Sequence, residues 1–141
     1  MRTPGREHVG IIELGSICAS MRARNLTLFE QLGGWVVDTS DHGLQRLFAL
    51  ASHLHAWHAE LWAQRAPTIP EVELDNSVAR PPSPLVAPGE RADDYRAALD
   101  TMLEDLRRLS ARVDVLLDPS TARTIGLVTS DLVDLRQQLD G

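Results

Sequence analysis

The chain contains no lysine, a single cysteine and no long hydrophobic run. All 14 basic residues among its 141 are arginines. The lack of lysine excludes a Schiff base on the protein and a P-loop phosphate site, because both need a lysine amine. Cys18 has no second cysteine with which to form a disulfide, and its apolar neighbours predict an inert, buried thiol. No stretch reaches the roughly 20 apolar residues of a membrane span.

Basic blocks and targeting signals are also missing. The net charge is −6, and no cluster of arginines is present to neutralise phosphates, so neither nucleic acid nor an anionic membrane is an expected partner. The basic N-terminus is not followed by the apolar run, about 7–15 residues long, of a secretory signal peptide. We therefore expect a soluble cytoplasmic protein. A length of 141 residues predicts one domain over residues 1–141.

Apolar residues recur at helical spacing in four segments, while strand signals are nearly absent. This pattern predicts an all-α fold with helices at about 7–37, 41–66, 90–117 and 121–139. The third and fourth segments have the most regular apolar stripes. These stripes consist of Tyr95, Leu99, Met102, Leu106, Leu109, Val113 and Leu116, and of Ile125, Val128, Leu132, Leu135 and Leu139.

The connections between these segments indicate how the helices are arranged. The first and last connections are short, which favours an antiparallel hairpin at each end of the chain. Residues 67–90 have no helical period and contain six prolines, which lack the amide donor and favour an extended connector. A connector of this length reaches from one end of a bundle to the other. Two hairpins joined by one long crossover predict a ferritin-like four-helix bundle.

The second segment contains a dense group of chemically active side chains. His53, His55, His58 and Glu60 fall within eight residues, and imidazole is both an acid–base group near neutral pH and a common metal ligand. At 100° per residue, His58 falls near the centre of the apolar face and His55 at its edge. His53 and Glu60 fall on the opposite side, where we expect a solvated face or a subunit contact.

The register of the first hairpin adds further residues to the inner histidines. A turn at residues 38–41 places Arg24 and Asn25 level with His55 and Leu54, and Met21 level with His58. Arg24 and Asn25 interrupt the apolar stripe of the first helix, and burying such groups without partners costs several kcal/mol, so we expect a polar network or a polar pocket there. We predict His58 and His55 as catalytic residues, with a substrate bound by Arg24, Asn25, Met21 and Trp62.

The first hairpin also resembles a known family. Arg24–Trp35 (RNLTLFEQLGGW) and His55–Trp62 (HAWHAELW) resemble small actinobacterial ferritin-like proteins of uncharacterised function. The resemblance implies the bundle fold and leaves the activity open. Metal-binding ferritin-like proteins use Glu-x-x-His pairs, whereas this chain has His55-x-x-His58 and no Glu or His in its fourth segment. We therefore expect no standard di-iron centre and no cofactor, and His55 and His58 are the candidate ligands if a metal binds.

Three classes of function remain open from the sequence. The first is a small enzyme of specialised metabolism, in which His58 acts as acid and base and Arg24 orients an anionic group of a small molecule. The second is a non-catalytic binding or scaffold module, homodimeric through exposed aromatic and apolar residues. The third is a non-standard mononuclear metalloenzyme that uses His55, His58 and a carboxylate.

Overall fold

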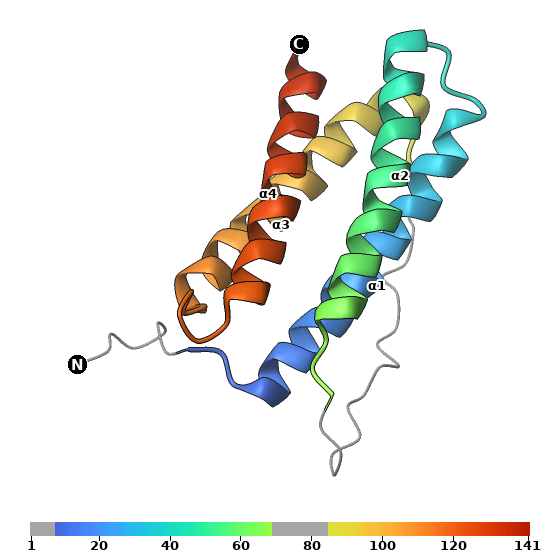
Figure 1. Ribbon diagram of the computed structural model, residues 1–141. Coiled ribbons are helices and arrows are strands. Elements are labelled where there is room, and N and C mark those ends of the chain that lie inside the picture. Colours follow the sequence, from blue (N-terminus) through green and yellow to red (C-terminus); the bar gives the residue numbers. More distant parts are fainter. Residues whose placement is uncertain (1–7, 69–84) are drawn as a thin grey trace.

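Helices make up the regular structure of the chain. The computed structural model describes residues 8–68 and 85–141, and these ranges contain four α-helices, one short 3₁₀-helix and no β-strand. The elements, shown in Figure 1, are α1 (Ile11–Val36), α2 (His42–Arg65), η1 (Pro88–Glu90), α3 (Arg91–Arg112) and α4 (Pro119–Asp140). The all-helical prediction is confirmed for these ranges. The first helix begins at Ile11 and not at about residue 7, because residues 8–10 are described and are not helical, and its N-cap is Gly10, a poor helix former. Residue 7 itself and most of the proline-rich connector lie outside the described residues.

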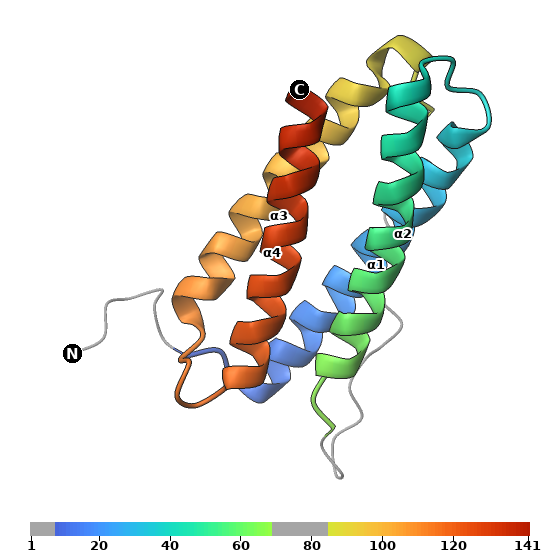
Figure 2. The same cartoon turned by 45° about the horizontal axis from the view of Figure 1, so that its top comes forward.

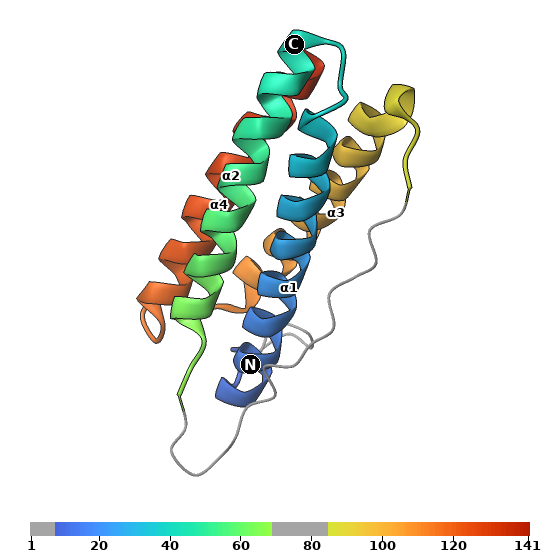
Figure 3. The same cartoon turned by 90° about the vertical axis from the view of Figure 1, so that its right-hand side faces the viewer.

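The four α-helices lie side by side as a bundle (Figures 1 and 2). In these views α2 runs back along α1, with which it makes the most extensive contact, and α4 runs back along α3. Figure 3 shows α4 beside α2, a pair that is also in direct contact. Among the described helices, none combines the length and the apolar character that a bilayer-spanning helix needs.

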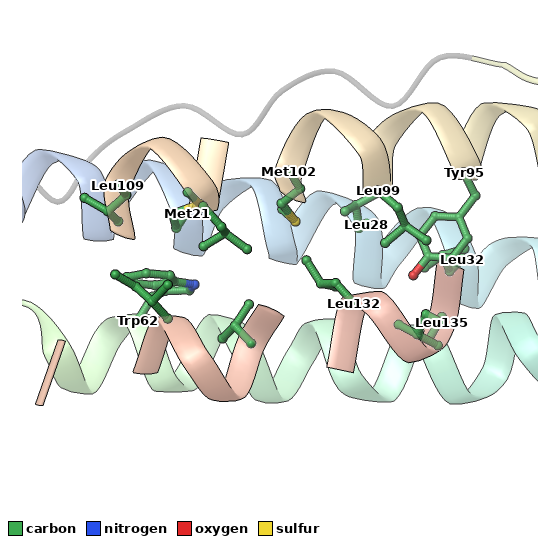
Figure 4. Close-up of a cluster of buried hydrophobic side chains, with 14 of the residues drawn as sticks. Met21, Leu28, Leu32, Trp62, Tyr95, Leu99, Met102, Leu109, Leu132 and Leu135 are labelled. Carbon is green, nitrogen blue, oxygen red and sulfur yellow. The ribbon is translucent and has the colours of Figure 1, made fainter. Parts of the chain in front are cut away.

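Each helix directs one stripe of side chains into a shared core (Figure 4). Leu32, Leu99, Leu106, Leu132 and Leu135 are completely buried. Each such side chain contributes about 1.5–3 kcal/mol when it is fully removed from water. The regular apolar spacing of the third and fourth segments therefore corresponds to the stripes that face the core, over most of their length.

The end of α3 differs from the prediction. The helix ends at Arg112, not at about residue 117. Leu116, which the apolar spacing places on the inner stripe, is 91% exposed. The Asp114 carboxylate accepts a hydrogen bond from the backbone N–H of Leu116 at 2.8 Å. An aspartate that bonds to the nearby backbone competes with the helix, and this competition is not visible in the spacing of apolar residues.

A buried arginine holds the start of α3 against the connection between α1 and α2. Arg91 donates from Nη1 and Nη2 to the two carboxylate oxygens of Asp38, at 2.8 and 3.2 Å. Its guanidinium also lies 5.6 Å from the ring centroid of Trp35, a distance at which a cation is attracted to the ring face. These contacts join the second half of the chain to the first at one end of the bundle.

Candidate functional site

His55 lies in a closed hydrogen-bond network that joins α1, α2 and α3. Its Nδ1 is 2.8 Å from Oδ1 of Asn25, and its Nε2 is 2.7 Å from the hydroxyl of Tyr95. Asn25 donates from Nδ2 to the backbone carbonyl of Met21 at 2.8 Å. Because Asn25 turns its carbonyl oxygen toward the ring, His55 donates from Nδ1 and accepts the Tyr95 proton at Nε2. Every polar atom of the His55 ring therefore has a partner.

The network is electrically neutral. His55 is completely buried, and this burial, reinforced by the neighbouring His58, lowers the pKa of its imidazole to about 3. Burial also raises the pKa of the Tyr95 hydroxyl well above its usual range. Both groups remain uncharged at neutral pH, so the network holds three helices together without a buried charge.

His58 has a different environment. Its Nε2 is 2.8 Å from Oδ2 of Asp131 on α4, and the Asp131 side chain is 36% exposed. A carboxylate only accepts hydrogen bonds, so the proton of the neutral imidazole is on Nε2 and the lone pair is on Nδ1. Burial lowers the pKa of His58, and the hydrogen bond and charge of Asp131 oppose this shift. The Nδ1 atom is buried and has no hydrogen-bond partner within the described part of the chain.

Trp62 lies one helical turn beyond His58. Its side chain is completely buried, and its indole Nε1 likewise has no hydrogen-bond partner among the described residues. In Figure 4 this nitrogen is on the side of the ring that faces along the core toward Met102 and Leu132. An indole N–H is a donor only, whereas the Nδ1 of His58 is an acceptor. Two adjacent turns of α2 thus bring an unpaired acceptor and an unpaired donor to the same face.

The buried face of α2 is rotated from the predicted one. His55 and His58 are both completely buried, with their ring centroids 5.9 Å apart and their planes at 84°. Leu54 and Leu61, which the apolar spacing places beside His58 on the inner face, are only partly buried. The prediction that His55 lies at the edge of this face is wrong. Asn25 and Tyr95 satisfy its ring nitrogens, so the imidazole can occupy the core without a desolvation penalty for unpaired atoms.

Arg24 and Met21 lie on the side of α1 that faces α3. The guanidinium of Arg24 is 3.0 Å from Asp105 on α3 and 3.7 Å from the Met21 sulfur. Both residues line a surface pocket of about 360 Å³, which also contains Arg108, Arg112 and Glu13 and contains neither inner histidine. The structure therefore brings Asn25 to His55 and directs Arg24 away from the histidines.

The remaining sequence candidates have simpler surroundings. His53 and Glu60 are exposed, and Glu60 accepts a bond from Gln64 at 3.4 Å. Cys18 is buried, and burial raises the pKa of its thiol to about 11, which corresponds to an inert thiol at neutral pH. In residues 8–68 and 85–141, no three side chains of the types His, Cys, Asp or Glu are gathered to hold one metal ion.

Sequence reasoning missed the two partners that define the inner histidines. Tyr95 is recognisable as a member of the α3 stripe, but its spacing does not reveal that its hydroxyl reaches His55. Asp131 lies one residue before Leu132, at the margin of the α4 stripe. An acidic residue at this margin is the only local signal. Comparison with known proteins gives no further guide, since the chain matches no family model, no curated protein and no solved structure.

Proposed function

We propose that the chain is a ferritin-like four-helix bundle that binds a small molecule in its core, beside His58, without a standard di-metal centre. The observation that carries the proposal is the His58 imidazole, which is completely buried, bonded at Nε2 to Asp131 and, among residues 8–68 and 85–141, unpaired at Nδ1. A buried polar atom without a partner is uncommon in folded proteins and needs an explanation, of which a missing ligand is one. The ferritin-like arrangement is supported by the direction of the helices, because α2 ends and α3 begins at opposite ends of the bundle (Figure 1).

His58 and His55 have different roles in this proposal. Both nitrogens of His55 are bonded, to Asn25 and Tyr95, so His55 is a positioning residue that holds α2 in place. His58 is the inner histidine whose Nδ1 lone pair has no partner in the part of the chain that the structure describes. When Nδ1 accepts a proton from a bound molecule, the resulting imidazolium is stabilised by the adjacent Asp131 carboxylate, which is the usual role of a carboxylate beside a catalytic histidine. An enzyme of specialised metabolism built on this site would use His58 as its acid and base.

The proposal is tested by nuclear magnetic resonance on the full chain. Toluene is titrated into ¹⁵N- and ¹³C-labelled protein, and the ring nitrogens of His58 and the methyl group of Met102 are followed. We expect saturable changes at both groups. The exposed His53 on the same helix provides the control, since His53→Ala should leave the response unchanged. Saturable binding that moves only surface signals would rule out a ligand site in the core.

A specific observation favours a second function, a homodimeric scaffold. Leu50 and Trp57 on α2 are 44% and 49% exposed, and Leu54 and Leu61 are partly buried at the same 4-3-4 spacing. Such spacing is typical of a helix that packs against another helix. Analytical ultracentrifugation of the wild type and of Trp57→Glu tests this function, with a concentration-dependent dimer expected only in the wild type. A monomeric wild type would exclude it.

A further inference from the structure

We infer that the molecule bound beside His58 carries a hydroxyl group, and that this hydroxyl joins His58 Nδ1 to Trp62 Nε1. The inference rests on the proposed ligand site and adds the chemical class of the ligand. It begins with the spacing of the two residues. Positions i and i+4 of a helix are neighbours on one face, and both side chains are completely buried.

The hydrogen-bonding roles of His58 Nδ1 and Trp62 Nε1 determine which chemical group can bond to both. With Nε2 donating to Asp131, His58 offers an acceptor at Nδ1, while the indole of Trp62 offers a donor. One hydroxyl donates its proton to the first atom and accepts from the second. A carbonyl or carboxylate oxygen would satisfy only Trp62, and an ammonium group would satisfy only His58. A single hydroxyl therefore satisfies the hydrogen-bonding capacity of both atoms.

The side chains around these two nitrogen atoms indicate the character of the rest of the ligand. In Figure 4 the Trp62 indole nitrogen faces the part of the core that contains Met102 and Leu132, and Met21 belongs to the same core. All four side chains belong to one cluster of buried hydrophobic residues. A molecule that enters this environment replaces apolar contacts, so its body must be apolar. An alcohol or a phenol meets both conditions.

Phenol and toluene provide a matched pair of probes, because they differ mainly by a hydroxyl in place of a methyl group. Both are titrated into the full chain while the His58 ring ¹⁵N signals and the Trp62 indole N–H signal are recorded. We expect phenol to bind about tenfold more tightly than toluene, because its hydroxyl forms two hydrogen bonds that toluene lacks, one to His58 and one from Trp62. Phenol should move both signals. In Trp62→Phe, which keeps an aromatic ring and removes the donor, the preference for phenol should shrink, because only the hydrogen bond to His58 remains, whereas His53→Ala should retain the full preference.

The outcomes separate this inference from the proposed function. Equal affinities for phenol and toluene in the wild type would overturn the hydroxyl inference and leave the ligand site intact. If neither probe moves the core signals, both proposals fail. The inference would also be overturned by a long-lived water that shows a nuclear Overhauser effect to the Trp62 indole proton and that phenol does not displace. In that case a buried water, and not the hydroxyl of a ligand, bonds to the two atoms. If Trp62→Phe does not fold, protection of the wild-type indole proton from exchange on adding phenol decides the question.

Discussion

Lowering the pH from 8 to 5 should destabilise the bundle through His55. Its pKa is about 3 in the folded chain, against a reference value of 6.5. Between these two values the unfolded chain binds a proton that the folded chain does not, so the free energy of unfolding falls as the pH falls. His55 contributes its full stabilisation above pH 6.5 and loses it progressively down to about pH 3.

The size of the effect follows from the same two values. A pH of 5 is 1.5 units below the reference pKa of the unfolded imidazole. At 1.36 kcal/mol per unit, the free energy of unfolding therefore falls by about 2 kcal/mol. Burial also lowers the pKa of His58, which adds a loss of the same sign. The carboxylates with lowered pKa values, such as Glu13 and Asp38, start from reference values of 4.5 and 3.8. Their contribution is lost mainly below pH 5, so this window isolates the histidines.

Urea denaturation at several pH values, at constant ionic strength, measures the free energy of unfolding. His55→Gln removes the titrating group, and we expect its loss of stability between pH 8 and pH 5 to be about 2 kcal/mol smaller than that of the wild type. A second measurement needs no variant: the Cε1 proton signal of His55 should keep its neutral position at pH 5. Equal losses in the wild type and His55→Gln, or a His55 signal that titrates above pH 5, would refute the reasoning.

Four further predictions concern the core, the network and a helix end. Tyr95→Phe leaves Nε2 of His55 buried without its donor, so urea denaturation should show a loss of about 1–3 kcal/mol. Leu132→Ala should cost about 2–5 kcal/mol because the side chain is completely buried, whereas the neighbouring Val133→Ala, 39% exposed, should stay within about 0.5 kcal/mol; thermal denaturation compares them. The Cys18 thiol should react with Ellman's reagent only after unfolding, and rapid reaction of the native chain would contradict its burial. Asp41→Ala removes the carboxylate that caps α2 and should cost about 1 kcal/mol in the same denaturation assay.

The helices could be predicted from the sequence because their signals are local. The stripe from Tyr95 to Leu109 recurs at helical spacing, and Asp41 and Asp118 cap α2 and α4 through the backbone N–H of a residue three positions later. Such signals involve neighbours within one or two turns and are therefore visible in the order of residues. The exception is the end of α3, where the side chain of Asp114 bonds to the backbone and the helix stops before Leu116.

The hairpin register could also be predicted, since a short turn allows few alternatives. It places Arg24 level with His55 and Asn25 level with Leu54, within one residue of the observed hydrogen bond between Asn25 and His55. The same register does not show where Arg24 points. Its guanidinium reaches Asp105 on α3, because the partner that is nearest in space comes from a helix whose position the first hairpin does not define.

Helical periodicity and turn chemistry are properties of neighbouring residues, so the order of amino acids alone was enough to specify an all-helical chain with His55 and His58 on one helix. The character of these histidines depends on residues that are distant in the chain. Tyr95, 40 positions away, closes the neutral hydrogen-bond network around His55. Asp131, 73 positions away, holds the proton of His58 on Nε2. A hydrogen bond requires its two heavy atoms within about 3 Å, and only the packing of α3 and α4 against α2 brings these atoms that close.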